Sequence, residues 1–184
     1  MRRFSRIFAW TTPLFVAGAV LFFTKAAALP FKVAYPVLLL GVSTLLLRRR
    51  ELLPFGFAFL FSAAGDAVGA KGLFIPQMAF FALAHAAYVC WFLPRAQRTP
   101  RAVSLAVTVP LLLFLFIGVV PNAPVPAERI GVAVYGLVIA AMLCSALQYD
   151  GAHAAGFRCA AQLFVFSDAS EWLDGVELQD RNCP

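Results

Sequence analysis

The chain has 184 residues, of which 62% are hydrophobic and 13% are charged, and its formal net charge is +6 at pH 7. Soluble domains contain roughly 45–50% apolar and 25% charged residues, so this composition excludes an ordinary soluble protein and indicates a polytopic membrane protein. The basic residues lie between apolar runs, which makes membrane topology a better explanation of the positive charge than nucleic-acid binding. We therefore expect an all-α transmembrane bundle that forms a single domain over residues 1–184, with no nucleic-acid partner.

The apolar runs predict about six full spans and a partial seventh. The six runs are Ile7–Phe23, Val33–Leu47, Leu52–Ala70, Leu73–Leu93, Ala102–Val120 and Ile130–Leu147. A cleaved signal peptide is the alternative for the first run, but that run is longer than the ~7–15 apolar residues of a signal peptide. The seventh run, Phe157–Ala169, is shorter than the ~17–25 residues that a span needs. Acidic residues follow it, so we expect the last helix to end near Asp168 and residues 168–184 to form a polar tail.

The positive charges predict the orientation of these spans. With the amino terminus in the cytoplasm, ten basic residues fall on the inside and four on the outside, which agrees with the positive-inside rule. The inside residues are Arg2, Arg3, Arg6, Arg48, Arg49, Arg50, Arg95, Arg98, Arg101 and Arg158; the outside residues are Lys25, Lys32, Lys71 and Arg129. We expect a multi-pass integral membrane protein with a cytoplasmic amino terminus. The bacterial inner membrane is favoured, and the endoplasmic reticulum is the alternative.

Three ionisable side chains occur in or at the end of apolar runs, namely Asp66, His85 and Asp168. A charge at the centre of a membrane helix costs ~2.5–3.5 kcal/mol even on the lenient insertion scale, so each needs a partner or a function. Hydroxyl groups that could partner them are those of Ser62, Tyr88, Tyr135 and Ser167. Ser62 precedes Asp66 by four residues, a spacing that places both on one face of a helix.

Structural roles are the alternative for the same residues. Asp66 could be a carboxylate that only holds helices together, and His85 a neutral imidazole that bonds to a neighbouring helix. Tyrosines in membrane helices commonly pack or lie at the interface. Gly65 and Gly69 form a G-x-x-x-G pattern, which indicates close helix packing. The cysteine and histidine spacings fit no metal site, so neither a metal ion nor another cofactor is expected.

Four short motifs follow one another along the chain. They are Phe61–Asp66, Phe80–Tyr88, Val134–Ile139 with Met142, and Leu163–Asp168. Together they resemble the YhhN-like family of multi-span membrane proteins, whose characterised members are lysoplasmalogenases. The resemblance covers residues 31–168.

The resemblance implies a membrane-embedded hydrolase whose partner is a lipid, a lysophospholipid with a vinyl ether. Water cleaves the vinyl ether to a fatty aldehyde and a glycerophospho-ethanolamine or -choline. Such a reaction needs one carboxyl group that donates a proton to carbon and one carboxylate that stabilises the resulting cation and orients water. We assign Asp66 and Asp168 as this catalytic pair, in either order, and expect their carboxyl groups within ~10 Å of each other. The expected supporting or substrate-binding residues are Ser62, His85, Tyr88, Tyr135 and Ser167.

The carboxyl-terminal segment departs from the resemblance, which implies further spans after Asp168. In their place this chain has an acidic segment, so we expect Asp168 to lie near a membrane surface and to stay ionised. The 184-residue chain is then expected to show weak or no hydrolase activity. The alternative function is a non-catalytic or transport-like lipid-binding membrane protein, because intramembrane Asp and His residues also mark substrate pathways.

Overall fold

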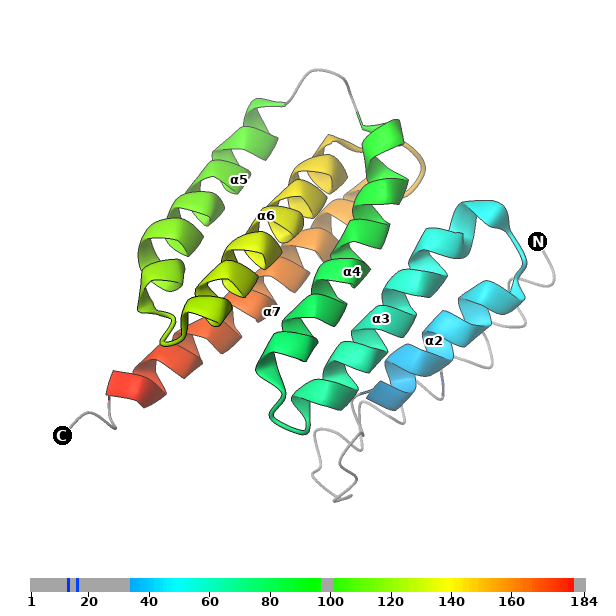
Figure 1. Cartoon of the computed structure of the whole chain (residues 1–184). Coiled ribbons are helices and arrows are strands. Elements are labelled where there is room, and N and C mark those ends of the chain that lie inside the picture. Colours follow the sequence, from blue (N-terminus) through cyan, green and yellow to red (C-terminus); the bar gives the residue numbers. More distant parts are fainter. Residues whose placement is uncertain (1–12, 14–15, 17–33, 97–100, 181–184) are drawn as a thin grey trace. The chain divides into compact units, whose positions relative to one another are not determined.

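A computed structural model describes residues 13, 16, 34–96 and 101–180 of the chain, and for residues 169–180 it describes the backbone alone (Figure 1). The first predicted span, Ile7–Phe23, lies almost entirely outside these residues, as does the predicted cytoplasmic amino terminus.

The described residues fold into helices and form no β-strand. The helices are α2 (Ala34–Leu46), α3 (Leu53–Gly69), α4 (Phe74–Phe92), α5 (Ala102–Leu113), α6 (Pro126–Gln148) and α7 (Ala154–Asp180). Four helical segments are long and apolar enough to cross a membrane: Arg50–Gly69, Phe74–Arg95, Ala102–Asn122 and Pro126–Gln148. The predicted all-α transmembrane fold is therefore confirmed, while the number of spans stays a prediction.

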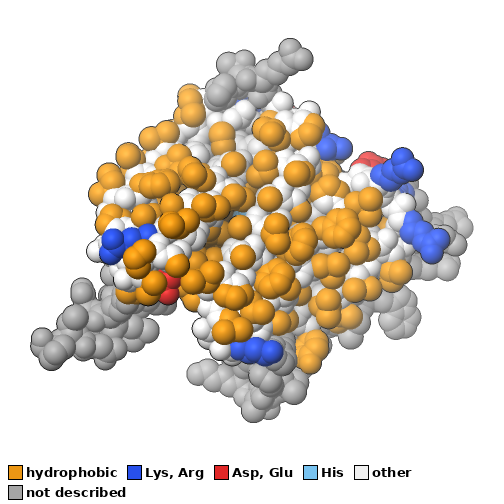
Figure 2. Space-filling model, viewed as in Figure 1, with side chains coloured by type: hydrophobic (Ala, Val, Ile, Leu, Met, Phe, Trp, Pro, Cys, Tyr) orange, Lys and Arg blue, Asp and Glu red, His pale blue; other side chains and the backbone are white. Residues whose placement is uncertain are grey.

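The surface agrees with this fold. Large hydrophobic side chains are exposed on all of these helices up to Phe166, and Figure 2 shows hydrophobic side chains over most of the face in view. In water such a surface would be unfavourable, whereas in a bilayer it faces lipid chains.

The chain folds as two compact units, an N-terminal unit, Met1–Trp91, and a C-terminal unit, Phe92–Pro184. The single domain expected from the sequence stays a prediction. In the N-terminal unit, α2 and α3 approach closely through glycine. A Cβ atom added to Gly56 would lie 2.4 Å from Leu45 Cδ2, and one added to Gly41 would lie 3.0 Å from Leu60 Cδ2. Small residues at both contacts let the two backbones come together, as is common between membrane helices.

The turn between α3 and α4 needs a left-handed backbone. Gly72 has φ of 72°, a conformation that glycine adopts without the steric penalty of a side chain. The sequence predicts a hinge at Lys71–Gly72, and the structure confirms it.

In the C-terminal unit, α6 packs against α5 along one side and α7 along the other (Figure 1). Pro110 lies inside α5, where it removes a backbone donor. The helix then widens into a π-helix, η3 (Phe114–Val119). Helix α6 begins at Pro126, earlier than the expected Ile130, because proline is well suited to the first turn of a helix.

The prediction that the last helix ends near Asp168 is wrong. Helix α7 continues to Asp180 through the acidic segment. Exclusion of acidic residues from hydrocarbon does not by itself end a helix. A helix can leave the membrane and continue in water, and Glu and Leu, which recur in this segment, are good helix formers.

Candidate functional site

The clearest contact between candidate site residues lies in the C-terminal unit. The hydroxyl of Tyr135, on α6, donates a hydrogen bond to Oδ2 of Asp168, on α7. Tyr135 is buried, and Asp168 is half-buried. This bond joins two of the predicted site residues that are 33 positions apart in the chain.

The contact lies well inside the helix pair. At 1.5 Å per residue, Tyr135 is about 14 Å along α6 from Pro126 and about 20 Å from Gln148. Asp168 therefore lies beside the middle of a helix that is long enough to cross a membrane. The expectation that this carboxyl group sits near the end of its helix, in water, finds no support in the C-terminal unit.

Asp66 has a different position in its own unit. It lies one turn before the end of α3 and is half-buried, and Ser62, one turn earlier, is buried. Two glycines flank it, and both receive side chains from α4. A Cβ atom at Gly65 would lie 3.1 Å from the Phe81 ring, and one at Gly69 would lie 2.5 Å from the Gln77 carboxamide carbon. The packing role of the G-x-x-x-G pattern is thus confirmed.

His85 and Tyr88 lie on the predicted face of α4, and both are buried. The Nδ1 atom of His85 is 2.7 Å from the carbonyl oxygen of Phe81, one turn earlier in the same helix. Because a carbonyl can only accept, Nδ1 carries the proton in this contact. This bond runs within α4, and the structural alternative, in which His85 bonds to a neighbouring helix, stays a hypothesis.

Tyr88 is surrounded by aromatic rings. Its ring meets Phe55, Phe59 and His85 edge-on, with centroid distances of 5.6, 6.4 and 6.4 Å. Phe55 also meets Trp91 at 4.9 Å. Edge-to-face pairs of this kind are favourable packing contacts. Tyr88 is thus well placed as a packing residue of the N-terminal unit.

The two predicted catalytic carboxyl groups belong to different units, Asp66 to the N-terminal and Asp168 to the C-terminal one. Their predicted separation of ~10 Å therefore stays a prediction. Ser167, the predicted neighbour of Asp168, is exposed. Among the described residues, no group of three His, Cys, Asp or Glu side chains is arranged to hold a metal ion.

Sequence reasoning missed a buried polar cluster between α5 and α6. Gln148 Nε2 donates to Cys144 Sγ at 3.0 Å and lies 3.4 Å from Ser104 Oγ. Ser104 and Gln148 are buried, as is Thr108, whose hydroxyl oxygen has no hydrogen-bond partner within the described part of the chain. The four-residue spacing of Ser104 and Thr108 could have indicated this cluster from the sequence, because it puts both residues on one face of a helix.

Comparison with family models matches residues 27–174 to the YhhN family. Comparison with curated proteins and with solved structures gives no match. The matched range contains every candidate site residue named from the sequence, including Asp66 and the Tyr135–Asp168 pair. Since the match extends over most of the chain, this protein belongs to the YhhN family.

Proposed function

We propose that this protein is a membrane-embedded hydrolase that cleaves the vinyl-ether bond of a lysoplasmalogen. The observation that carries the proposal is the hydrogen bond from Tyr135 to Asp168 beside the middle of α6. A carboxyl group in that position is costly unless it is partnered, and a carboxyl group that is both partnered and partly accessible can take part in proton transfer. Family membership supports the same reaction class.

The reaction needs three steps. A carboxylic acid donates its proton to the double-bond carbon that is not bonded to oxygen, giving an oxocarbenium ion. A water molecule then adds to the cationic carbon and gives up a proton to a carboxylate. The hemiacetal that forms breaks down to the fatty aldehyde and the glycerol hydroxyl. The two carboxyl groups divide the work of proton donor and of anion that stabilises the cation and orients water.

In this proposal Asp66 and Asp168 are the catalytic residues. The Tyr135 hydroxyl fixes the rotamer of the Asp168 carboxyl group, so one oxygen is held by Tyr135 and the other can face the substrate. Ser62 lies one turn from Asp66 on the same helix and can orient it in the same way. His85 is bonded within α4 and Tyr88 is packed among rings, so both support the N-terminal unit in this proposal.

The position of Asp168 changes the expectation for activity. Two reasons to expect weak activity come from the sequence: the further spans that the resemblance implies after Asp168, and a position of Asp168 in water at the end of its helix. The structure continues α7 to Asp180 and sets Asp168 beside Tyr135, so the second reason no longer holds. We propose that the 184-residue chain itself supports hydrolysis.

The test is release of fatty aldehyde from a lysoplasmalogen by the purified protein in detergent or nanodiscs. We expect Asp66→Asn and Asp168→Asn each to reduce the rate at least ~100-fold, the lower end of the contribution of general acid–base catalysis. Glu51→Gln is the matched control, because it removes an exposed carboxylate in the turn before α3 and should leave the rate unchanged.

Full activity in either aspartate variant would remove that residue from the mechanism. A folded protein that binds lysoplasmalogen and releases no aldehyde would favour the other function, a non-catalytic or transport-like lipid-binding protein. Thermal unfolding of each variant separates a loss of chemistry from a loss of fold.

A further inference from the structure

One end of the C-terminal unit carries a charged cluster that the proposed reaction does not use. Arg101, at the start of α5, and Arg158, on α7, both bind the carboxylate of Asp150 in the loop between α6 and α7. The nitrogen–oxygen distances are 2.8 Å for Arg101 and 3.1 Å for Arg158. Two guanidinium groups thus share one carboxylate, and the Arg101–Asp150–Arg158 cluster has an excess of one positive charge.

The loop that holds the cluster is fixed from several sides. The backbone carbonyl of Tyr149 accepts hydrogen bonds from Arg158 Nε at 3.2 Å and Nη2 at 2.5 Å. The Tyr149 ring meets those of Phe92 and Phe157 edge-on, with centroid distances of 5.8 and 5.7 Å. These contacts make the cluster a pre-organised arrangement and limit the conformational entropy that a ligand must remove on binding.

The side chains of the cluster are partly exposed, and Arg158 has a donor that a ligand can use. The side chains of Arg101 and Arg158 remain 31% and 28% exposed, and that of Asp150 is 56% exposed. Arg158 makes its hydrogen bonds within the described part of the chain through Nε and Nη2, which leaves Nη1 available to a ligand. A guanidinium group presents its donors in a planar fork that matches phosphate oxygens.

Lipid-facing side chains lie next to the cluster. On α5, Val103 and Leu105 follow Arg101 closely and are exposed, as is Leu93 at the end of α4. Arg95, exposed, precedes Ala96, which pairs with Tyr149 in an isolated β-bridge. A third arginine therefore lies close to the same loop. Charged side chains at the ends of membrane helices commonly lie at the interface between membrane and water.

The cluster is too far from Asp168 to hold the headgroup of a reacting substrate. Arg158 and Asp168 are about 15 Å apart along α7, at 1.5 Å per residue. The vinyl-ether oxygen and the phosphorus of a lysoplasmalogen are separated by five bonds and span about 6 Å. Arg158 is also turned toward Tyr149 and Asp150, which precede it in the chain, whereas Asp168 follows it, so we assign the cluster to a second lipid molecule.

We propose that the Arg101–Asp150–Arg158 cluster binds the phosphate of an anionic phospholipid, with the acyl chains of that lipid along the exposed apolar side chains of α5. Asp150 holds the two guanidinium groups in place and limits their affinity for a second anion. The lipid is a structural or regulatory ligand, distinct from the substrate. The proposal does not depend on hydrolase activity.

The test is native mass spectrometry of the full chain released from nanodiscs that contain equal amounts of phosphatidylglycerol and phosphatidylcholine. We expect retained phosphatidylglycerol on the wild-type protein. Arg158→Gln and Arg101→Gln should each weaken its retention about fivefold, the effect of one arginine near a membrane surface. Asp150→Asn should strengthen it, because the arginines lose their competing anion. This opposite sign distinguishes a binding site from a purely structural ion pair.

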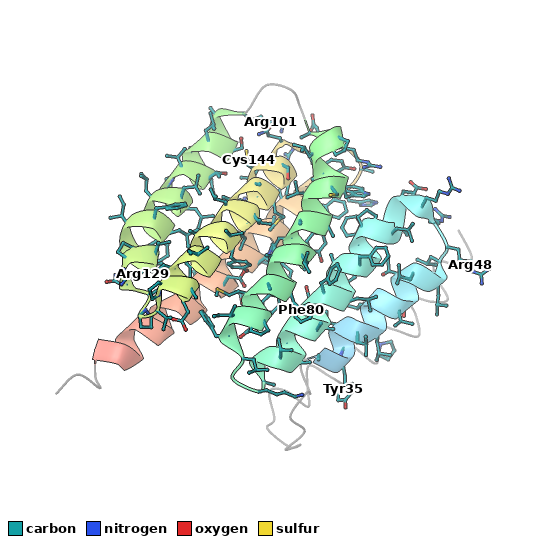
Figure 3. All side chains as sticks on the ribbon, in the orientation of Figure 1. Tyr35, Arg48, Phe80, Arg101, Arg129 and Cys144 are labelled. Carbon is teal, nitrogen blue, oxygen red and sulfur yellow. The ribbon has the colours of Figure 1, made fainter. Side chains whose placement is uncertain are left out.

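Arg129→Gln is the matched control. It removes the same charge at the opposite end of the C-terminal unit, where Arg129 Nε donates to the Ala123 carbonyl (Figure 3). We expect it to leave phosphatidylglycerol retention unchanged. If Arg158→Gln fails to fold, the opposite effects expected for Arg101→Gln and Asp150→Asn still test the site.

Two results would overturn the proposal. The first is equal loss of phosphatidylglycerol in Arg158→Gln and Arg129→Gln, which would show a general effect of net charge. The second is displacement of the lipid by millimolar inorganic phosphate, which would show that the site takes a free anion and not a lipid. In either case the hydrolase proposal would stand unaffected, because it is tested by aldehyde release alone.

Discussion

The two units of the molecule surround a buried tyrosine in different ways. In the C-terminal unit, polar groups meet across helices, as in Tyr135 with Asp168 and Gln148 with Ser104. In the N-terminal unit, His85 bonds to a carbonyl of its own helix, and Tyr88 is enclosed by rings. Bonds between helices fix their register, whereas ring packing fills space without specifying a polar partner. A tyrosine hydroxyl should therefore matter far more in one unit than in the other.

Removal of the two tyrosine hydroxyls is the strongest test of this difference. Tyr135→Phe leaves a half-buried carboxyl group without its donor, and the loss of a buried hydrogen-bond partner costs about 1–3 kcal/mol. We also expect a loss of at least ~10-fold in aldehyde release, since the carboxyl group is no longer oriented. Tyr88→Phe should change the free energy of unfolding by less than about 0.5 kcal/mol, because its ring contacts remain.

Both variants can be measured by thermal unfolding in detergent, together with the aldehyde assay. Equal effects of Tyr135→Phe and Tyr88→Phe on the free energy of unfolding would contradict the expected difference between the two units. If Tyr135→Phe lowered stability without lowering activity, the contact would be structural, and Tyr135 would have no role in orienting the Asp168 carboxyl group.

Helix approach in the N-terminal unit gives the second test. In Gly56→Val, the added carbons enter the space of Leu45, whose Cδ2 and Cγ would lie 2.4 and 2.7 Å from a Cβ atom. Overpacking of this kind costs about 1–3 kcal/mol, so we expect a lower melting temperature.

The control for this substitution lies in α7. A Cβ atom added at Gly156 would meet no other side chain or backbone atom of the described residues within 4 Å. Gly156→Ala should therefore be neutral or stabilise the helix by up to about 1 kcal/mol. Similar destabilisation by the two glycine substitutions would show that backbone flexibility, and not close helix approach, explains the N-terminal result.

The smallest expected effects come from two turns with left-handed backbones. Gly72 in the N-terminal unit and His153 in the C-terminal unit have φ of 72° and 61°. A side chain costs roughly 1–2 kcal/mol in this conformation. We expect Gly72→Ala to destabilise by about 1 kcal/mol and His153→Gly to be neutral or slightly stabilising, as measured by urea or thermal unfolding. Stabilisation by Gly72→Ala would contradict the assigned turn.

The sequence predicted the helices well where hydrophobic runs end at charges or turn residues. The runs at Leu52–Ala70 and Leu73–Leu93 match α3 and α4 closely, because Arg50, Lys71 and Gly72 lie just outside the ends of these runs. The end of α7 was missed for a physical reason. The end of an apolar run indicates where a helix leaves the lipid. The helix itself can continue beyond that point, because its end depends on where the backbone hydrogen bonds stop.

The candidate site was predictable in part. Asp168 and Tyr135 were each identified from the sequence, the first as a charge at the end of an apolar run. Their contact was not, because the register between α6 and α7 depends on packing that no local pattern encodes. Ser104, Thr108 and Gln148 were missed because uncharged polar residues in an apolar run change its hydropathy little, so only their burial reveals them.

The π-helix in α5 has a consequence for how this chain can tolerate insertions and deletions. Each bond of a π-helix closes over one residue more than a bond of an α-helix, so η3 holds an extra residue in the same stretch of helix. Deletion of one residue within Phe114–Val119 can therefore convert this stretch to α-helix while the flanking turns keep their faces. The same deletion in α6 would rotate every later residue by about 100° and turn Tyr135 or Leu143 away from its neighbours. Length variation should accumulate at η3 and be rejected in α6.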